Sequence, residues 1–336
     1  MKACIVGYGA IGPVHAEAIS HLDRVSLHAI CDIDPARARL GAEKHHAIPY
    51  FRYEDCLADE EIDVIHICTP HYLHFPMITE ALKHGKRVVV EKPCVMKREE
   101  LTVLLRDYDV TRIFPILQNR TNDCVQAMLH RAVTDRTLGR LLGIKGFLTW
   151  YRDAAYYDSA DWRGTKEGEG GGVLINQAVH TLDLMTLFGG EVERVAATVA
   201  NHSIESIAVE DTLEARIAFR SGAVGLLYAS NGYVKNPPAQ LDLDFEHGNL
   251  CYRNGMLFAN GELICRDGQQ FKGKSYWGNG HTKTLSDYYE KGSSLSLRDA
   301  CNTLMTMFAI YESAEKGTAV SLRTEKEDLH EDSVSG

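Results

Sequence analysis

The chain has 336 residues, of which 45% are hydrophobic and 24% are charged. These values are typical of a globular protein with a sizeable core, and they exclude collagen-like, low-complexity and wholly disordered chains. Lysine and arginine number 36 and aspartate and glutamate number 46, which gives a net charge of −10. An acidic chain without a basic block is a poor match for a protein that binds nucleic acid or an anionic membrane. At about 100–200 residues per domain, the length predicts two domains.

Two features of the chain bear on its location. No apolar run approaches the ~20 residues that cross a bilayer, and the apolar run after Met1 is too short for a signal peptide. The nine cysteines include no CxxC pair, which indicates reduced thiols in the core rather than disulfides or metal ligands. We therefore expect a cytoplasmic protein that binds no membrane. The acidic and polar residues 324–336 are predicted to form a tail outside the domains.

The first 118 residues alternate short apolar runs with amphipathic segments. The expected strands cover 3–6, 25–31, 64–68, 88–90 and 113–117, and the expected helices cover 13–22, 35–44, 75–84 and 97–109. Short apolar strands separated by helices are typical of a parallel sheet that is covered on both faces. Because such crossovers are right-handed, we predict a Rossmann domain, a doubly wound parallel α/β sheet, over residues 1–120.

The pattern changes after residue 120. We expect helices at 123–134, 173–188 and 300–316, and strands at 143–150, 192–199, 213–219, 224–230, 241–246 and 263–266. Turn signals such as Asn254-Gly255 and Asn260-Gly261 separate several of the strands. We therefore predict a second α/β domain over residues 121–323, with a large, mostly antiparallel open sheet.

A glycine-rich motif, GYGAIG at 7–12, follows the first expected strand and opens the first expected helix. In a dinucleotide-binding turn, the first glycine permits the tight turn, the second lets the backbone approach the pyrophosphate, and the third allows close helix–strand packing. An aspartate ends the second strand 20 residues later, where a ribose-binding acid is expected. The cofactor-binding residues predicted from this motif are Gly7, Gly9, Ala10, Ile11, Gly12 and Asp32. The alternative is a glycine-rich turn with an incidental acid.

The acid also bears on the choice of cofactor. Asp32 would accept hydrogen bonds from both ribose hydroxyls and would repel a 2′-phosphate. No arginine stands directly beside it in the sequence, so we expect NAD rather than NADP. Arg37 and Arg39 are near enough along the chain to keep NADP as the alternative.

A lysine lies directly after the fourth expected strand, in the sequence Glu91-Lys92-Pro93. Ligands of open parallel sheets bind at the carboxyl ends of the strands. A residue before proline is held in an extended conformation, so Lys92 is expected in an extended turn, where it could donate a hydrogen bond to a substrate hydroxyl. The alternative is a solvated lysine at a strand end.

A second set of polar residues follows the glycines at 170–172. On one helix, Asn176 and His180 are four residues apart and His180 and Asp183 are three apart, so the three side chains would share one face. A polar stripe on an otherwise apolar helix needs partners or a ligand. His180 suits general-base chemistry near neutral pH, and Asp183 could orient its imidazole. The alternative is a core histidine whose hydrogen bonds are satisfied.

Taken in order, these motifs resemble those of the glucose–fructose oxidoreductase / inositol dehydrogenase (Gfo/Idh/MocA) family. They are GYGAIG at 7–12, CDIDP at 31–35, CTPHYLH at 68–74, EKP at 91–93, QNR at 118–120, WRG at 162–164, GGGVLINQAVHTLD at 170–183 and YWGNGH at 276–281. The resemblance covers nearly the whole chain. It implies an N-terminal Rossmann domain, a C-terminal α/β domain, NAD(P)-linked oxidation of a sugar or polyol hydroxyl, and homodimers or homotetramers formed through the C-terminal sheet.

The resemblance also assigns roles to residues. As cofactor-binding residues near the nicotinamide it implies Thr69, Pro70, His71, His74, Glu91, Lys92, Pro93 and Gln118. As substrate-binding residues it implies Lys92, Tyr157, Trp162, Arg163, Asn176 and His180. The aromatic side chains Tyr156, Tyr157 and Trp162 would form a ring-stacking wall or, equally, part of the core or an interface. Arg163 would hold a carboxylate, a phosphate or a ring hydroxyl. The family uses no metal, so no metal site is predicted.

The chain departs from many members of the family in having Asn176 where they have aspartate. An amide cannot exchange a proton at neutral pH and can only position a hydroxyl. We therefore expect the proton to move through His180 or Lys92, with Asn176 as the third catalytic residue. The predicted activity is that of a dehydrogenase acting on a secondary hydroxyl of a sugar, amino sugar, cyclitol or sugar derivative.

Two other functions remain open. In a glycoside hydrolase or lyase on the same scaffold, NAD would stay bound and oxidise a sugar carbon transiently. A non-catalytic NAD-binding sensor is the other alternative, although the presence of both Lys92 and His180 argues against it. The particular sugar cannot be read from the sequence.

Overall fold

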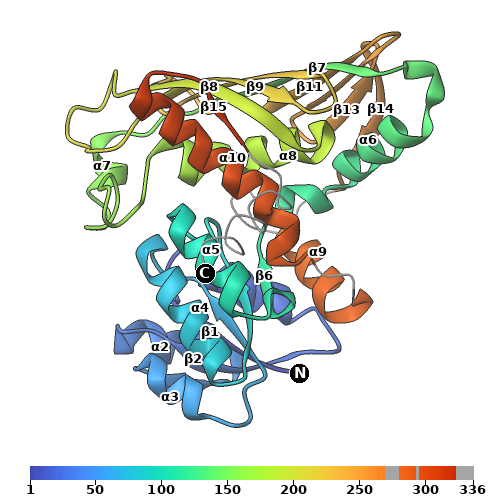
Figure 1. Cartoon of the computed structure of the whole chain (residues 1–336). Helices are drawn as coiled ribbons and strands as arrows, with labels where there is room; N and C mark the ends of the chain where they lie inside the picture. The colour runs from blue at the N-terminus through green and yellow to red at the C-terminus, as the bar shows by residue number, and fades with distance from the viewer. Residues whose placement is uncertain (269–279, 293–294, 323–336) are drawn as a thin grey trace, which may run out of the picture. The chain divides into compact units, whose positions relative to one another are not determined.

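The computed structural model of the chain describes residues 1–268, 280–292 and 295–322 (Figure 1). The chain folds into two compact units. The first comprises Met1–Asn122, Glu167–Gly170 and Gln269–Ala300, and the second comprises Asp123–Lys166, Gly171–Gly268 and Cys301–Gly336. The expected tail at 324–336 and the first four residues of the YWGNGH motif lie outside the described residues.

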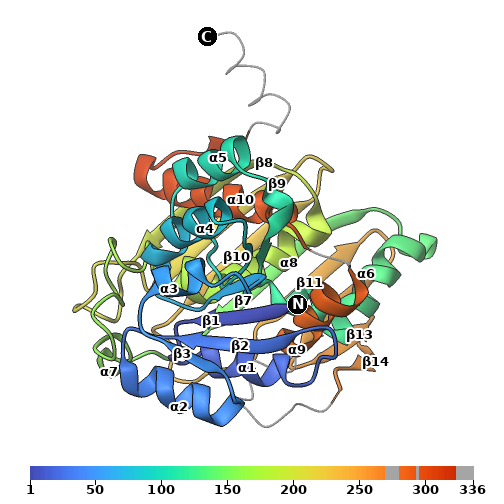
Figure 2. The same ribbon diagram turned by 90° about the horizontal axis from the view of Figure 1, so that it is seen from below.

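The first unit is built on a six-stranded parallel sheet with the strand order β3-β2-β1-β4-β5-β6. Its strands are β1 (Lys2–Val6), β2 (Ser26–Cys31), β3 (Ile48–Tyr50), β4 (Val64–Ile67), β5 (Arg87–Val90) and β6 (Ile113–Pro115). Its α-helices are α1 (Gly12–Ile19), α2 (Pro35–His45), α3 (Tyr53–Ala58), α4 (His74–Lys83), α5 (Arg98–Asp107) and α9 (Gly280–Ser286). Strands β1, β2 and β3 lie side by side in Figure 2. This strand order is that of a Rossmann fold, and the expected doubly wound sheet is confirmed.

The central strands of this sheet are apolar on both faces because helices cover both. Val88, Val89 and Val90 of β5 have no exposed surface, and the same is true of Ile65 and Ile67 of β4. Each such side chain contributes about 1.5–3 kcal/mol to the free energy of unfolding. Helix α9 packs against α1 (Figure 2), so a segment from late in the chain completes this unit.

The sequence analysis missed two elements of the first unit, β3 and α3. Strand β3 has only three residues and contains Pro49, which cannot donate a ladder hydrogen bond and is tolerated because the strand lies at the sheet edge. Helix α3 has six residues and no side-chain cap. Both are too short to produce a periodic hydrophobic pattern.

The second unit contains a nine-stranded sheet with the order β14-β13-β12-β11-β7-β10-β9-β8-β15. Its strands are β7 (Leu141–Thr149), β8 (Val192–Ala200), β9 (Thr212–Phe219), β10 (Val224–Ser230), β11 (Gln240–Phe245), β12 (Asn249–Arg253), β13 (Met256–Ala259), β14 (Glu262–Arg266) and β15 (Val320–Ser321). Neighbouring strands are antiparallel except for β7 and β10. The large, mostly antiparallel sheet that the sequence predicts is therefore confirmed.

The helices of the second unit are α6 (Asp123–Thr134), α7 (Ala154–Tyr157), α8 (Val179–Gly189) and most of α10 (Leu297–Lys316). Helix α8 packs on β7, β10 and β11 (Figure 1). Strands β12, β13 and β15 were not predicted, although the turns that bound β13 were. Asn254 and Gly255 both have positive φ, as do Asn260 and Gly261, which is the backbone that tight hairpin turns require.

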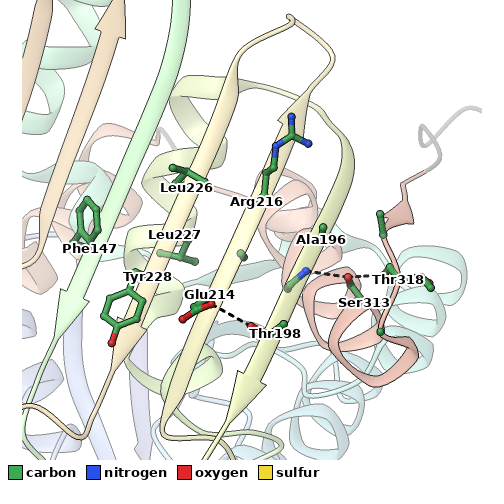
Figure 3. Close-up of a pocket in the computed structure, with 14 residues that line it drawn as sticks. Phe147, Ala196, Thr198, Glu214, Arg216, Leu226, Leu227, Tyr228, Ser313 and Thr318 are labelled. Carbon is green, nitrogen blue, oxygen red and sulfur yellow. Dashed lines mark hydrogen bonds between the residues drawn. The ribbon is translucent and has the colours of Figure 1, made fainter.

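One face of the nine-stranded sheet carries exposed apolar side chains. Phe147 is 40% exposed and Leu226 is 51% exposed, and Tyr228 lies opposite Phe147 on the neighbouring strand. Figure 3 shows these side chains beside Glu214 and Arg216, around a depression of about 550 Å³ that the end of α10 also lines. Large exposed apolar side chains gathered on one face indicate a contact surface.

All nine cysteines are free thiols, and Cys251 and Cys265 are the two that are partly exposed. The other seven are buried in the core. In the described part of the chain, no helix is long and apolar enough to cross a membrane.

Candidate active site

The glycine-rich turn has the backbone that a dinucleotide site requires. Gly7 has a φ of +93°, and a Cβ placed there would lie 2.6 Å from the carbonyl oxygen of Cys68. A Cβ on Gly12 would lie 2.3 Å from the carbonyl oxygen of Gly7. By contrast, a Cβ on Gly9 would meet only Arg37, at 3.9 Å. The outer two glycines are therefore required by the fold, and the exposed Gly9 leaves room for a pyrophosphate to approach the backbone.

Asp32 is buried at the end of β2 and is held by backbone donors. It accepts hydrogen bonds from the N–H groups of Tyr8 (2.7 Å) and Asp34 (2.8 Å). The first turn of α2 also brings Arg37 within 3.3 Å of its Oδ1, and Arg37 pairs with Asp34 at 3.2 Å. The sequence places no arginine directly beside Asp32, but the helix supplies one in space.

The register of the parallel sheet brings three predicted motifs to one edge. Val6, Ile67 and Val90 are aligned partners on β1, β4 and β5. The residues that follow them begin the glycine turn, the 68–74 segment and the Glu91-Lys92-Pro93 turn. Because the strands are parallel, all three leave the sheet at its carboxyl edge, where ligands of such sheets bind.

The predicted histidines of the 68–74 segment hydrogen-bond to backbone carbonyl groups. His74 is fully buried, with Nδ1 2.7 Å from the oxygen of Pro93 and Nε2 2.9 Å from the oxygen of Thr69. Burial lowers the pKa of His74, although these two carbonyl groups oppose that effect. His71 lies 2.8 Å from the carbonyl oxygen of Glu169. His74 therefore links the 68–74 segment to the turn that carries Lys92.

Glu91 is the centre of a buried network that the sequence analysis did not predict. Its Oε1 lies 3.0 Å from Nε2 of His15 and 3.0 Å from Nε2 of His281, and its Oε2 accepts the backbone N–H of Lys92 at 3.2 Å. His15 Nδ1 lies 2.9 Å from Nδ1 of His66. The side chains of His15, Glu91 and His281 also have the spacing of a metal site, but hydrogen bonds alone account for their geometry.

The network continues to a tyrosine, and one set of neutral tautomers satisfies it. Tyr289 lies 2.6 Å from Nε2 of His66. If Glu91 is ionised, His15 donates from Nε2 and must accept at Nδ1, so His66 donates from Nδ1 and accepts the Tyr289 hydroxyl at Nε2. The hydrogen bonds then run in one direction, from Tyr289 to the carboxylate.

The charges of this network follow from burial and hydrogen bonding. Burial alone would raise the pKa of Glu91, but the hydrogen bonds from His15 and His281 outweigh it and hold that pKa well below its usual range. Burial lowers the pKa of His15, and it lowers the pKa of His66 further because His15 lies beside it. The folded chain therefore holds the Glu91 carboxylate ionised and the imidazoles of His15 and His66 neutral.

Lys92 lies half-buried in the first unit, after β5. The Lys92–Pro93 peptide bond is cis. Gln118 is buried at the start of a short 3-10 turn, Gln118–Thr121, in the same unit. Asn176, His180, Trp162 and Arg163 belong to the second unit.

In the second unit, two close contacts explain the glycine repeat. A Cβ on Gly171 would lie 2.1 Å from the hydroxyl of Tyr311, and one on Gly172 would lie 1.8 Å from the carbonyl oxygen of Glu210. The buried Glu210 carboxylate accepts the N–H groups of Gly172 (2.9 Å) and Leu174 (3.1 Å) and the hydroxyl of Tyr311 (2.8 Å). Burial raises the pKa of Glu210, against the effect of these donors. Because these glycines have no side chains, the backbone N–H groups at the start of the helix can reach the Glu210 carboxylate.

The expected single α-helix over 173–188 is corrected by the structure. A π-helical turn, Leu174–Ala178, precedes α8. Such turns insert one extra residue and are frequent at functional sites. Asn176 lies within this turn and donates a hydrogen bond to Tyr156 Oη at 3.3 Å. Asp183 is buried and accepts a hydrogen bond from Thr303 (2.8 Å), so that its carboxylate contacts α10.

The predicted aromatic residues divide between core and surface. Tyr157 is buried in a small core with Ile204, Ile207 and Val209, and its hydroxyl accepts a hydrogen bond from Asn231 at 3.1 Å. The neighbouring Tyr156 accepts one from Arg163 Nη1 at 2.6 Å. Tyr156 is half-buried, whereas Tyr157 belongs to the core, and no local sequence signal distinguishes the two.

Comparison with known proteins shows the family. The model for the oxidoreductase family with an NAD-binding Rossmann fold matches residues 1–110, and the GFO/IDH/MocA C-terminal domain matches residues 127–251. The chain therefore belongs to the Gfo/Idh/MocA family of NAD-binding oxidoreductases. The resemblance seen in the motifs is confirmed, as is the expected NAD-binding Rossmann domain.

Individual relatives agree with this assignment. The chain is 30% identical over 66% of its length to the uncharacterized oxidoreductase YrbE of Bacillus subtilis, and the match spans 65% of that protein, just under two thirds. It is 26% identical to myo-inositol 2-dehydrogenase of Thermotoga maritima, over 74% of each chain. The WlbA dehydrogenase of Chromobacterium violaceum, solved with NADH and UDP-GlcNAcA, is 29% identical with a TM-score of 0.84, covering 97% of this chain and 96% of that one. Two of these three relatives are named as dehydrogenases.

Replacing Gly9 by alanine should separate cofactor binding from folding. A Cβ at this position meets no backbone atom within 4 Å, so the melting temperature of the apoprotein should stay close to the wild-type value. The methyl group would occupy the approach to the pyrophosphate, and we expect the Kd for NAD to rise at least about tenfold, or ~1.4 kcal/mol. Gly12→Ala is the matched comparison and should lower the melting temperature. Calorimetric titration with NAD checks the first result, and unchanged affinity in Gly9→Ala would contradict it.

The buried network should make the protein less stable in acid. His15 and His66 stay neutral in the folded state, so below about pH 6.5 only the unfolded chain takes up their protons. Each histidine then lowers the free energy of unfolding by up to about 1.4 kcal/mol per pH unit. The pKa of Glu91 is also depressed, and its contribution is lost as the pH falls further. Urea unfolding over a pH series should show this slope, and a His66→Gln variant with an equally steep slope would refute the assignment.

Proposed function

We propose that the chain oxidises a secondary hydroxyl of a sugar, amino sugar, cyclitol or sugar derivative with NAD. The observation that carries this proposal is the alignment of Val6, Ile67 and Val90 in the parallel sheet. It brings the glycine turn and the Lys92 turn to one edge, so that a cofactor held by the first would have its reactive end within the region of the second. The inositol and sugar-nucleotide enzymes among the relatives support a polyol or sugar derivative as substrate.

The residues of the glycine turn and Asp32 would hold NAD, which accepts a hydride from the carbon of the alcohol when it is bound. Lys92 would donate a hydrogen bond to the hydroxyl oxygen and stabilise the negative charge that develops there. His180 would take the hydroxyl proton as general base. Asn176, whose amide cannot exchange that proton, would hold a neighbouring hydroxyl. The remaining predicted residues, Thr69, Pro70, His71, His74, Pro93 and Gln118, would line the nicotinamide end of the site.

Lys92→Ala and His180→Ala should each lower kcat by ~10²-fold or more, the usual contribution of a positioned acid or base. NADH formation with a panel of sugars and cyclitols measures this, and circular dichroism confirms folding. His21→Ala, in the exposed segment after α1, is the control. Full activity in both active-site variants would remove the mechanism. Release of an aglycone without net NADH would favour the hydrolase, and NAD binding without turnover of any polyol would favour the sensor.

We further propose that the exposed face of the nine-stranded sheet joins copies of the chain into a homodimer or homotetramer. Phe147, Leu226 and Tyr228 supply the apolar part of this face, and Glu214 and Arg216 supply opposite charges that can pair across a twofold axis. The depression among them can accept side chains of a second copy.

A Phe147→Glu, Leu226→Glu double variant should shift the protein toward the monomer, because a buried unpaired charge would be forced into the contact. Sedimentation velocity measures the change. Val133→Glu, on the 69% exposed position of α6, is the control and should keep the wild-type state. The surface is misassigned if the double variant sediments like the wild type.

A further inference from the structure

Residues 150–163 of the second unit contain two arginines whose guanidinium groups each lie against two aromatic rings. The Cζ atom of Arg152 lies 5.0 Å from the ring centroid of Trp150 and 5.0 Å from that of Tyr156. The Cζ atom of Arg163 lies 4.5 Å from the centroid of Tyr156 and 4.6 Å from that of Trp162. We call these five side chains the arginine–aromatic ladder. Both guanidinium groups contact the same tyrosine ring, so two positive charges are held close together.

No carboxylate in the described parts of the chain forms an ion pair with either arginine of the ladder. Arginine keeps its charge at every accessible pH. Asp153, the acid next to Arg152 in sequence, instead accepts the backbone N–H of Tyr156 at 2.9 Å as the cap of α7. Two like charges without a counter-charge in half-buried surroundings repel each other, and an anion between or beside them relieves that repulsion.

Each guanidinium also keeps a buried donor for a ligand. Arg163 uses Nη1 to donate to the hydroxyl of Tyr156 at 2.6 Å, and Arg152 uses Nη1 to donate to Asn236 Oδ1 at 3.0 Å. The Nε atoms of both arginines are buried and have no hydrogen-bond partner among the described residues. A buried donor calls for an acceptor. The Nε–H and adjacent Nη–H of one arginine form a fork that a carboxylate or phosphate accepts with two parallel hydrogen bonds.

The ladder adjoins the residue that we propose to orient the substrate. The hydroxyl of Tyr156 accepts hydrogen bonds from Asn176 Nδ2 and from Gln177 Nε2, both at 3.3 Å. The amide of Gln177 is fixed in this orientation because its Oε1 accepts a hydrogen bond from Asn231 at 3.1 Å. Tyr156 is therefore the one residue that would separate a group bound at the ladder from Asn176.

We propose that the arginine–aromatic ladder is an anion subsite that binds the negatively charged group of the substrate. The inference rests on the proposed function and narrows its substrate class to acidic sugar derivatives, in which the sugar bears a carboxylate or a phosphate ester. The aromatic rings suit the apolar faces of the sugar or of an attached base. Arg163 supplies the two-pronged contact, and Arg152 adds the second positive charge.

Matched sugars provide the test. Initial rates of NADH formation are compared for glucose, glucuronate, glucose 6-phosphate and UDP-glucose, and for the corresponding N-acetylglucosamine series. In the wild-type protein, kcat/KM for at least one anionic member should exceed that for its neutral parent by about 10–100-fold, the effect of a charge-assisted, bidentate contact. The preferred anion then distinguishes a carboxylate from a phosphate or a nucleoside diphosphate. Raising the salt concentration should reduce this preference.

Two substitutions at one position assign the preference to the ladder. Arg163→Gln should lower the ratio of anionic to neutral kcat/KM at least about tenfold, mainly through KM, and Arg163→Lys should recover only part of it because lysine lacks the fork. Arg136→Gln, in the exposed turn Arg136–Leu138 of the same unit, is the matched control and should keep the wild-type ratio. Thermal melting shows whether each variant is folded.

Calorimetry separates failure of this inference from failure of the proposed function. If sugars are oxidised but neutral and anionic members react equally well, or Arg163→Gln keeps the wild-type ratio, the anion subsite is refuted and the dehydrogenase stands. If no sugar reduces NAD but titration shows that anionic sugars bind to the wild-type protein and not to Arg163→Gln, the anion subsite is supported and the proposed dehydrogenase activity is refuted.

Discussion

The buried charge of Glu91 is the constraint on which the first unit depends. A carboxylate removed from water is costly unless hydrogen bonds replace its hydration. Here the donors come from three separate segments: His15 on α1, His281 at the start of α9, and the backbone of Lys92. The same interactions that keep the charge stable therefore hold α1, α9 and the Lys92 turn in fixed positions. The lysine that we propose for catalysis is placed by the residue before it.

The second unit also contains a buried carboxylate that accepts backbone hydrogen bonds next to its candidate site residues. Glu210 is buried, and it receives the N–H groups of Gly172 and Leu174 at the start of the π-helical turn. Asn176 follows within that turn, and α8 with His180 continues from it. Gly172 is needed because the backbone of Glu210 approaches too closely for any side chain, and Gly171 because the hydroxyl of Tyr311 does. In each unit, a buried acid thus fixes a backbone segment, and the neighbouring polar side chains stay available for chemistry.

The arginine–aromatic ladder shows how local charge can oppose the charge of the whole chain. The net charge of −10 would repel an anionic substrate at long range. At short range, two arginines that lack acidic partners reverse the sign of the potential, and rings on either side exclude water and strengthen the attraction. Tyr156 accepts hydrogen bonds from Arg163 and from Asn176, so the proposed anion subsite and the proposed catalytic residue Asn176 share one hydroxyl group.

Sequence alone determined the features that depend on local chemistry. Apolar runs and glycine positions predicted the Rossmann sheet, the turns at Asn254 and Asn260, and the nucleotide-binding role of residues 7–12, because strand burial and positive φ restrict the residues allowed at each position. It also predicted that Lys92 and His180 carry the chemistry, because each stands in a motif with polar residues at a fixed spacing.

Only the tertiary structure decided the long-range contacts. His15, His66, Glu91 and His281 come from four distant parts of the chain, and no spacing rule joins them. The π-helical turn at Asn176 depends on Glu210, which lies more than 30 residues away in the chain. Tyr156 and Tyr157 are chemically alike, and only packing against Ile204, Ile207 and Val209 makes one a core residue while the other contacts two arginines. Contacts between residues far apart in sequence depend on how the whole chain packs, and local residue patterns carry no record of that packing.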